Sequence, residues 1–358
     1  MALSITFVLP GHGRFPVGGM KIVYEYANRL CAKGWRVNII HPAAIDSPRE
    51  SGYRKSKHYI RYLIWLVFKL YLPSSWFTVA HGVRLLWVPN LLEKQIPDAD
   101  YIVACPAVSA FSVNSYSPRK GRKFYFIQHF EDWSMKKEDV EKTWKLPLKK
   151  IVVSQWLKSL AHTLGEEAVC IPNGLDFTFF RETKQFHERP FRSILFISHT
   201  LDIKGTRYCV EACDLLKKKY PDITITTFSR YHKPAGFPLY ITYYCNPSQE
   251  QLRELYNSSA IYISASLSEG WDLPLCEAIL CGCVAVATDI NGHREYLQEG
   301  VNGFYCKPAS AESIVDRVEY VLTHPNAARA LSETAHQTLK QYDWDSRVRL
   351  FEEALLSK

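Results

Sequence analysis

The sequence of 358 residues has no apolar run of about 18 residues or more, the length that a helix needs to cross a bilayer. It also lacks the charged segment and cleavage site of a secretory signal, because Met1–Gly11 leads from a strand-like run directly into a glycine-containing loop. Neither a membrane-spanning helix nor an export signal is therefore predicted. We expect a cytoplasmic protein whose fold starts at the first residues.

Ten cysteines are present, yet their positions predict neither disulfides nor a metal site. Cys281-Gly-Cys283 has no His or Cys partner at zinc-finger spacing. Other cysteines, such as Cys209 and Cys213, fall on apolar faces of expected helices, where cysteine behaves as a small buried hydrophobe. We therefore expect a reducing compartment, no bound metal and no cofactor.

The formal net charge of +8 is modest. It permits nucleic acid, anionic lipid or a phosphorylated ligand as a partner. The chain lacks the basic repeat with interleaved aromatic residues that proteins binding single-stranded nucleic acid use. Nucleic acid is therefore not an expected partner.

The order of the expected strands and helices predicts two lobes of an α/β fold. Strand-like and helical segments alternate over 1–180 and again over 190–342, and the charged stretch Arg181–Arg192 reads as a polar linker. Such alternation is typical of parallel sheets. We predict two Rossmann-like lobes whose parallel sheets face a central cleft, with ligand at the carboxyl ends of the strands.

Two glutamates eight positions apart mark the most informative segment. Glu269 follows the strand-like run Ala260–Ala265, and Glu277 falls in the first turns of a helix that Pro274 opens and Gly282 ends. A loop carboxylate, a helical carboxylate and free backbone N–H groups then surround one small space. This combination suits a ligand that carries both hydroxyls and phosphate, as a nucleotide-sugar does.

A second anion site is expected in the same lobe. The strand Ser193–Ser198 leads to Lys204-Gly205, and Thr206 is the expected N-cap of the next helix. A lysine beside free helical N–H groups favours an anion. Such a charge would stabilise a departing diphosphate.

Two loops of the first lobe are further candidates. The loop that ends in Gly18-Gly19 follows the first strand, contains the cation Arg14, and is not a G-x-G-x-x-G motif. Its glycines allow the backbone to approach a ligand closely. His129 ends the strand-like run 124–128 and precedes Glu131 and Asp132, which either orient it or are surface acids.

The segment from Glu269 to Asp289 resembles the E-x7-E signature of glycosyltransferase family 4, whose members are retaining enzymes with the GT-B fold. That signature usually reads Glu-Gly-Phe-Gly-Leu-Pro, so Trp271-Asp272 replaces an aromatic-Gly pair. The Lys204-Gly205 stretch resembles the Gly-Arg and Lys-Gly motif of the family. Ser198 and His199 occupy the Gly-Arg positions, so a histidine that is mostly neutral at pH 7 replaces the arginine.

The resemblance implies a role for each candidate. Glu277 would hold the ribose hydroxyls, Glu269 would contact the transferred sugar, and Lys204 would neutralise the leaving group. The remaining donor contacts would come from His129, His199, the glycine loop of Gly18 and Gly19, and the backbone of Gly270, Trp271, Asp272 and Leu273. Arg14 would compensate for the missing arginine. The last helix, 343–358, would pack back on the first lobe.

The predicted activity is transfer of a sugar, with retention, from a nucleotide-diphosphate-sugar to a hydroxyl acceptor in cell-surface polysaccharide or glycolipid synthesis. The resemblance implies front-face departure without a protein nucleophile. It implies no essential metal, since no D-x-D triplet stands where metal-dependent transferases use one. Alternatives are another GT-B enzyme, such as a sugar phosphorylase or a nucleotide-sugar epimerase, and a non-catalytic, membrane-associated sugar-binding subunit.

The segment Tyr59–Leu72 is almost entirely apolar and follows the basic residues Arg54, Lys55 and Lys57. It is too short to span a bilayer. Two readings stand: an interfacial segment on an anionic membrane near a lipid-linked acceptor, or a buried helix of the first lobe.

Overall fold

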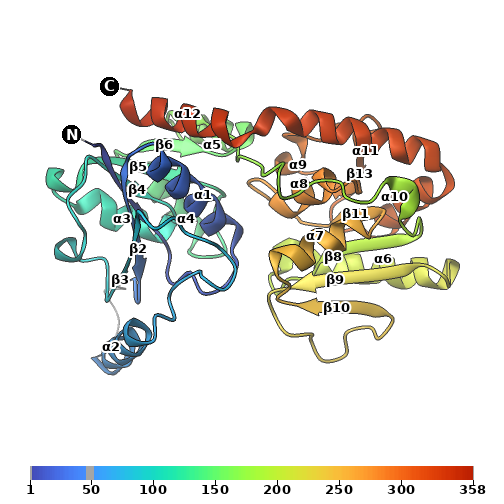
Figure 1. Ribbon diagram of the computed structural model, residues 1–358, viewed down its shortest axis with the longest axis horizontal. Coiled ribbons are helices and arrows are strands. Elements are labelled where there is room, and N and C mark those ends of the chain that lie inside the picture. Colours follow the sequence, from blue (N-terminus) through green and yellow to red (C-terminus); the bar gives the residue numbers. More distant parts are fainter. Residues whose placement is uncertain (1, 46–51, 358) are drawn as a thin grey trace. The chain divides into compact units, whose positions relative to one another are not determined.

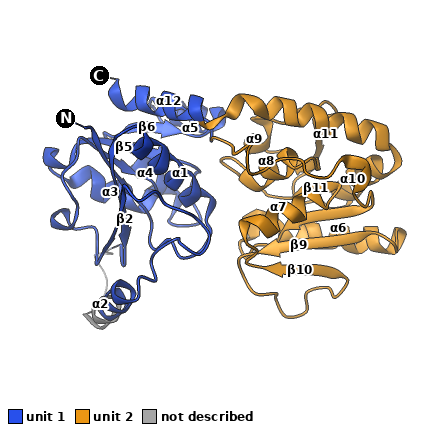
Figure 2. Cartoon of the chain, viewed as in Figure 1, with its two compact units in different colours: residues 1–173, 345–358 blue, residues 174–344 orange. Residues whose placement is uncertain are grey.

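The computed structural model describes residues 2–45 and 52–357, and side chains are described from residue 60 onward in the second range. The chain divides into two compact units. Unit 1 combines residues up to Asn173 with those from Asp345 onward, and unit 2 is the continuous segment Gly174–Trp344 (Figure 2).

Unit 1 is built on a seven-stranded sheet in which every neighbouring pair is parallel. The strands, in spatial order, are β3 (Val83–Val88), β2 (Arg36–Pro42), β1 (Ser4–Val8), β4 (Tyr101–Ala104), β5 (Arg122–Ile127), β6 (Lys149–Val152) and β7 (Ala168–Cys170). Its helices are α1 (Gly18–Ala32), α2 (Gly52–Val67), α3 (Ala107–Ser115), α4 (Lys137–Trp144), α5 (Gln155–Thr163) and α12 (Trp344–Leu356) (Figure 1).

Unit 2 repeats this plan with a six-stranded parallel sheet. In spatial order its strands are β10 (Ile241–Cys245), β9 (Thr224–Ser229), β8 (Ser193–Ile197), β11 (Ile261–Ser264), β12 (Val284–Thr288) and β13 (Phe304–Cys306). Its helices are α6 (Thr206–Lys219), α7 (Gln249–Asn257), α8 (Leu273–Leu280), α9 (Asn291–Arg294), α10 (Ala311–Thr323) and α11 (Pro325–Leu339). The predicted α/β class, with two parallel sheets, is confirmed.

Each sheet changes its winding direction beside its first strand. β1 pairs with both β2 and β4, and β8 pairs with both β9 and β11. In open parallel sheets, ligands bind beyond the carboxyl ends of the strands at this switch point. The loops after β8 and β11 are therefore the first place to look for a site in unit 2.

The core of unit 2 explains the cysteine pattern. Cys209 and Cys213 lie on the buried face of α6 and pack against strand residues such as Phe196 and Ile263. All ten cysteines lie in the described residues, and none of them forms a disulfide. Burial raises the pKa of the Cys213 thiol, so it stays a neutral hydrophobe as interpreted from the sequence.

Two local interpretations of the sequence are wrong. Thr206 is the first residue of α6, not its N-cap, because the left-handed Gly205 occupies the cap position. The stretch Arg181–Arg192 is not a free linker but packs on unit 2. Arg189 is buried there and donates hydrogen bonds to the carbonyls of Cys281 (2.5 Å) and Ser259 (3.3 Å).

The C-terminal helix α12 belongs to unit 1. The ring of Phe351 is fully buried, with ring centroids 4.4 Å from Tyr26 of α1 and 6.1 Å from Phe7 of β1. Arg122 of β5 donates a hydrogen bond to the Leu355 carbonyl at 3.2 Å. The last helix therefore completes the core formed by the first strand and first helix.

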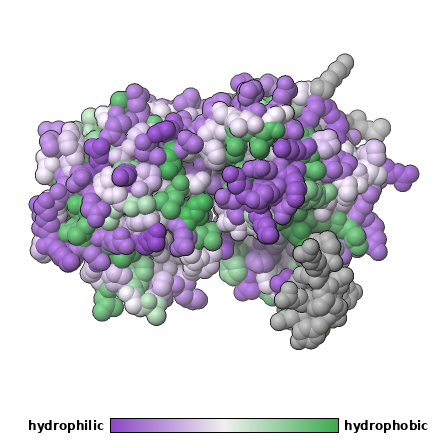
Figure 3. Space-filling model, turned by 180° about the vertical axis from the view of Figure 1, so that it is seen from behind, coloured by the Kyte–Doolittle hydropathy of each residue, from purple (hydrophilic) through white to green (hydrophobic). Residues whose placement is uncertain are grey.

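Figure 3 shows one face of the molecule, where polar and apolar side chains are mixed over both units. Within residues 2–45 and 52–357, no helix combines the length and the apolar character that crossing a bilayer requires.

Candidate functional site at the carboxyl ends of the strands

Lys204 and Glu269 meet at the switch point of unit 2. Lys204 follows β8 in the short helical turn Asp202–Lys204, and Glu269 lies in the loop after β11. The two loops are joined by a backbone hydrogen bond from Leu267 to the Ile203 carbonyl at 2.7 Å. The Lys204 ammonium lies 2.5 Å from Glu269 Oε1, which also accepts a hydrogen bond from Ser266 Oγ at 2.7 Å.

The surroundings of Lys204 keep its ammonium group charged. The Glu269 side chain is 6% exposed and the Lys204 side chain 29% exposed. Burial acts to lower the pKa of Lys204, but the carboxylates of Glu269 and Asp272 outweigh it and the pKa of Lys204 is raised. The lysine is therefore a cation that is partly open to a ligand.

Two glycines hold the backbone of these loops close together. Gly205 has φ +65°, and a Cβ there would lie 1.9 Å from the Ala265 carbonyl oxygen. A Cβ at Gly292 would lie 2.4 Å from the Glu269 carbonyl oxygen. Only glycine fits at either position without moving the loop that carries the Lys204–Glu269 pair.

Asp272 is buried and organises the loop between β11 and α8. Its Oδ1 accepts the Leu275 backbone N–H at 3.3 Å as the N-cap of α8, and its Oδ2 accepts from Ser264 Oγ at 2.6 Å. His293 Nε2 lies 3.2 Å from the same Oδ2. Burial acts to raise the pKa of Asp272, but His293, the charge of Lys204 and the Ser264 hydrogen bond together outweigh it, and the pKa lies below its usual value.

His293 is fully buried between acceptors on both sides. Its Nδ1 lies 2.7 Å from the Thr288 carbonyl oxygen, and its Nε2 faces the Asp272 carboxylate. Each ring nitrogen therefore lies within hydrogen-bond distance of an oxygen from another part of unit 2. The sequence analysis predicts a ligand contact for the backbone of Asp272 and makes no prediction for His293.

Trp271 is packed inside unit 2. Its side chain is 6% exposed, and its ring centroid lies 5.2 Å from that of Tyr296 and 4.9 Å from that of Tyr342. Gly270 and Leu273 are buried beside it. These side chains fix the loop, and backbone contacts with a ligand stay a prediction for Gly270–Leu273.

Glu277 lies in α8, which Leu273 begins and Pro274 follows at the second position. It is 7% exposed, and its Oε2 accepts a hydrogen bond from the Tyr256 hydroxyl at 3.3 Å. Burial and the Glu277 carboxylate raise the pKa of Tyr256, so the phenol remains a donor. Glu277 is thus a buried, oriented carboxylate.

His199 lies at the end of β8 in a single tautomer. Its Nδ1 accepts the Leu201 N–H at 3.0 Å, which leaves the proton on Nε2. Thr206 Oγ1 accepts the His199 N–H at 2.8 Å and donates to its carbonyl at 3.0 Å. Burial, with the charges of Lys204 and Arg230, lowers the pKa of His199 to about 4, so it is neutral at pH 7.

The unit 1 candidates lie at the corresponding edge of the other sheet. Gly18 and Gly19 begin α1, and Gln128 at the end of β5 donates to the Gly19 carbonyl at 3.0 Å. His129 follows, and its Nδ1 donates to the Phe130 carbonyl at 2.9 Å. The glycine loop and the His129 loop are therefore in direct contact.

Glu131 has a structural partner. Its Oε2 accepts the Ala107 N–H at 3.0 Å, at the first residue of α3. Burial raises the pKa of Glu131 to about 7, although this hydrogen bond acts to lower it. Asp132 is exposed. The exposed Arg14 lies in unit 1 with its guanidinium 5.4 Å from the Phe15 ring, so compensation for His199 stays a prediction.

Known proteins resemble both the sequence and the fold. Residues 239–338 match the model of the family described as glycosyl transferases group 1. The chain is 27% identical over 183 residues to the putative glycosyltransferase EpsD of Bacillus subtilis, covering 48% of this chain and 46% of that protein. It is 24% identical over 191 residues to a phosphatidyl-myo-inositol mannosyltransferase of Mycolicibacterium smegmatis, covering 51% and 50%. The chain thus spans about half the length of the curated relatives it matches.

Solved structures extend the likeness over almost all of the chain. Sucrose-phosphate synthase of Thermosynechococcus elongatus superposes with a TM-score of 0.75 at 13% identity, covering 98% of both chains. HepE of Anabaena, in complex with UDP and glucose, superposes with a TM-score of 0.71 at 14% identity, covering 99% of both. The protein has the GT-B glycosyltransferase fold. The family match falls in unit 2 and includes Glu269 and Glu277.

Proposed function

We propose that the protein is a retaining glycosyltransferase of family 4 that moves a sugar from a nucleotide-diphosphate-sugar to a hydroxyl acceptor. The observation that carries this proposal is the buried Glu269, joined to Lys204 at the switch point of the unit 2 sheet. The match of residues 239–338 to glycosyl transferases group 1 supports it. So do the GT-B neighbours, of which HepE is described with UDP and glucose.

In this proposal the donor is held by unit 2. Glu277, oriented by Tyr256, accepts from the ribose hydroxyls, and Glu269 accepts from a hydroxyl of the transferred sugar. The backbone N–H groups of Gly270–Leu273 and the start of α8 contact the sugar or the diphosphate. His199 donates to a phosphate oxygen from Nε2. His129, with the glycine loop of Gly18 and Gly19, contacts the donor from unit 1.

The chemical step requires charge stabilisation rather than a protein nucleophile. The bond between the sugar C1 and the diphosphate oxygen breaks, and its electron pair leaves with the diphosphate. The acceptor oxygen bonds to C1 on the same face, and its proton passes to a diphosphate oxygen. Lys204 stabilises the charge that develops on the leaving group.

The same lysine supports a reaction without an essential metal. In metal-dependent transferases a divalent cation supplies the charge that Lys204 supplies in this proposal. Transfer activity is therefore expected to persist in excess EDTA. Loss of activity in EDTA, restored by Mg²⁺ or Mn²⁺, would contradict this part of the proposal.

A thermal-shift panel of UDP-, GDP- and dTDP-sugars identifies the donor, because a ligand that binds only the folded state raises the melting temperature. Transfer from that donor is then measured for Glu269→Gln, Lys204→Met and the exposed control Glu254→Gln. We expect each site variant to lower kcat by about 100-fold or more, and the control to match wild type. Full transfer by both site variants would refute the assigned roles.

For the acceptor, we propose a lipid-linked hydroxyl compound on the cytoplasmic face of a membrane, in polysaccharide or glycolipid synthesis. Helix α2 supports this. Tyr62 and Trp65 stack on Trp87 at 6.3 and 5.7 Å. Among the side chains that the structure describes on α2 and just after it, from residue 60 onward, the exposed ones are mostly apolar: Ile60, Leu63, Ile64, Leu66, Val67 and Phe68.

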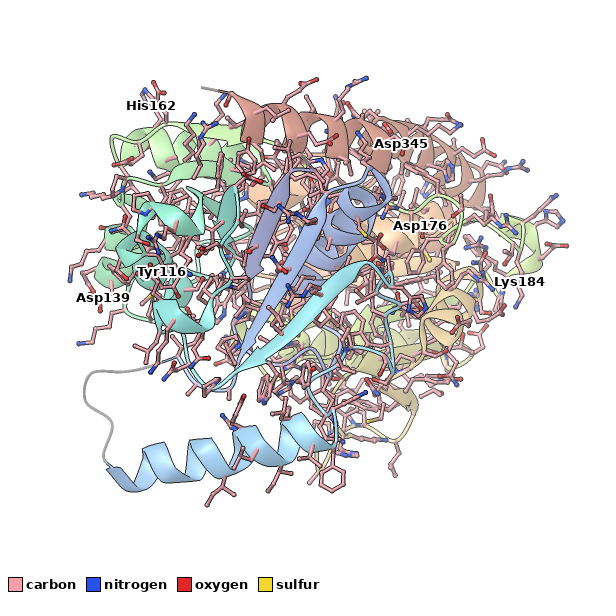
Figure 4. The ribbon with its side chains drawn as sticks, turned by 60° about the vertical axis from the view of Figure 1, so that its left-hand side comes forward. Tyr116, Asp139, His162, Asp176, Lys184 and Asp345 are labelled. Atoms are coloured by element: carbon pink, nitrogen blue, oxygen red, sulfur yellow. The ribbon has the colours of Figure 1, made fainter. Side chains whose placement is uncertain are left out.

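Figure 4 shows α2 at the edge of unit 1, with side chains that project away from the sheet. Basic residues Arg54, Lys55 and Lys57 precede this exposed segment in the sequence. An amphipathic helix with these features lies in the plane of an anionic membrane surface.

Co-sedimentation with vesicles of phosphatidylcholine and phosphatidylglycerol tests the membrane proposal. Val67→Glu and Phe68→Glu, at side chains 73% and 69% exposed, are expected to abolish binding. Leu239→Glu, at a side chain of unit 2 that is 94% exposed, controls for adding one charge at an apolar position. Absence of binding by wild type would remove the membrane from the proposal.

A further inference from the structure

Replacement of the family arginine by His199 leaves unit 2 with one fewer cation where diphosphate is proposed to bind. The neutral His199 offers one hydrogen-bond donor but no charge. Lys204 already faces Glu269. A second, uncompensated cation would restore the charge balance for a diphosphate.

Arg230 and His199 follow the carboxyl ends of two neighbouring strands. Arg230 directly follows β9, the parallel neighbour of β8, and the Ser198 N–H donates to the Phe228 carbonyl at 2.8 Å. The two side chains are linked through Tyr231. The His199 ring meets the Tyr231 ring edge-on at 5.3 Å, and the Arg230 guanidinium lies 4.6 Å from the same ring.

Tyr231 is itself held in place. Its N–H donates to Ser229 Oγ at 3.1 Å, and its carbonyl accepts from the Tyr243 hydroxyl of β10 at 2.9 Å. Arg230 Nη2 donates to the Tyr231 hydroxyl at 2.6 Å. The Tyr231 hydroxyl therefore orients the Arg230 guanidinium without carrying a negative charge that would balance it.

The charge of Arg230 is available to a ligand. Its side chain is exposed, and within the described residues it forms no ion pair with a carboxylate. By contrast, Arg192 at the amino end of β8 is paired with Asp222 at 2.7 Å. The charge of Arg230 also reaches His199, since it contributes to the lowered pKa of that ring.

We propose that Arg230 is the second diphosphate-binding cation of this enzyme, and that it takes over the role of the arginine that His199 replaces. A guanidinium presents a planar fork that binds two phosphate oxygens at once. Tyr231 is a positioning residue that directs this fork. The inference rests on the proposed function and adds a diphosphate-binding contact to it.

Isothermal titration with UDP, GDP and dTDP, and with the corresponding nucleosides, tests the inference. For the nucleoside diphosphate that wild type binds most tightly, Arg230→Gln is expected to weaken affinity by about 10- to 100-fold. Affinity for the nucleoside without phosphates is expected to stay unchanged. Arg230→Lys keeps the charge but not the fork, so it retains part of the affinity.

Arg192→Gln is the matched control, because it removes an exposed arginine from the opposite edge of the same sheet. Tyr231→Phe keeps the ring and removes only the hydroxyl that orients Arg230, so it is expected to weaken diphosphate binding by less than Arg230→Gln.

Two results would overturn the inference while leaving the proposed function intact. In one, Arg230→Gln binds the diphosphate as tightly as wild type. In the other, it weakens the nucleoside and the diphosphate equally. A wild type that binds none of the nucleoside diphosphates would refute the proposed function, and this inference with it.

Discussion

The side chain of Asp272 fixes the loop that carries the candidate acids. It caps α8, accepts from Ser264 of β11 and faces His293 of α9, so one carboxylate connects three elements. A ligand would have to displace these partners to reach its oxygens. We therefore interpret the carboxylate of Asp272 as the group that holds Glu269 and Glu277 in place, while its backbone N–H stays a proposed ligand contact.

Asp272→Ala is expected to lower the free energy of unfolding of unit 2 by about 3 kcal/mol or more. The change leaves buried His293 without its carboxylate partner and removes the N-cap of α8. Asp289→Ala, which breaks an exposed pair with Arg294, is expected to cost less than about 1 kcal/mol. Urea unfolding followed by tryptophan fluorescence compares the two. Equal losses would show that Asp272 is no more important than a surface acid.

Gly292→Ala addresses the position of Glu269 without touching its charge. The added methyl would lie 2.4 Å from the Glu269 carbonyl oxygen, so the loop must move. A displacement of this size is expected to reduce kcat by about 100-fold, with a small change in melting temperature. Asn291→Ala, at the exposed neighbouring position, is the control. Wild-type turnover in Gly292→Ala would contradict the required close approach.

Single residues also mark where sequence reasoning reached its limit. Glu269 and Lys204 were identified because both stand in recognisable motifs, and the structure brings them into contact. His293 was missed because its partner Asp272 lies 21 residues away in the chain. Arg230 was missed because it is linked to His199 only through the ring of Tyr231. Only the folded sheet makes those residues neighbours.

Strands and helices with strong patterns were predicted well. β8 and β11 are buried, mainly apolar runs, and both were expected close to their observed limits, over Ser193–Ser198 and Ala260–Ala265. β10 was not expected, because it is an edge strand in which only Ile241 is buried. A strand is recognised in a sequence by alternating apolar and polar residues, which requires one buried face. β10 has almost no buried face.

Glu131, which accepts a hydrogen bond from the first residue of α3, has a raised pKa that predicts a pH effect on stability. Glu131 keeps its proton up to about pH 7 in the folded state, whereas its ordinary pKa is 4.5. Between these two pH values the folded state binds more protons than the unfolded state. The contribution of Glu131 to the free energy of unfolding therefore falls as pH rises. Glu131→Gln is therefore expected to gain on the order of 2 kcal/mol over wild type between pH 5 and pH 8.

Thermal or urea unfolding at both pH values measures this gain. Asp132→Asn, at the exposed adjacent position, is expected to change the free energy of unfolding by the same amount at pH 5 and at pH 8. If Glu131→Gln and wild type respond to pH in parallel, the raised pKa of Glu131 is refuted.

The two-unit organisation depends on a helix far from the first strands in sequence. The α/β fold class was predicted from the alternation of strands and helices. Which unit α12 joins could not be predicted in this way, because it depends on how side chains pack. Phe351 supplies the reason. Its ring packs against aromatic rings of β1, α1 and β5 and fills the space that those three elements enclose.

Phe351→Ala is expected to destabilise unit 1 by about 3–5 kcal/mol, because it removes a fully buried aromatic ring. Leu356→Ala, at a side chain of the same helix that is 51% exposed, is expected to cost little. Hydrogen exchange resolved by segment separates the units: protection is expected to fall in β1 and α1 and to persist in β8 and β11. Equal loss in both units would mean that α12 does not belong to unit 1 alone.

The assignment of α12 to unit 1 has a consequence for biosynthesis. A ribosome adds all of Gly174–Trp344 to the chain before it adds the residues that complete unit 1. Until α12 has been made, Phe7 and Tyr26 lack the ring that packs on them, so unit 1 cannot complete its core during synthesis. Premature termination just before Asp345 would damage the amino-terminal half of the protein rather than the part nearest the stop.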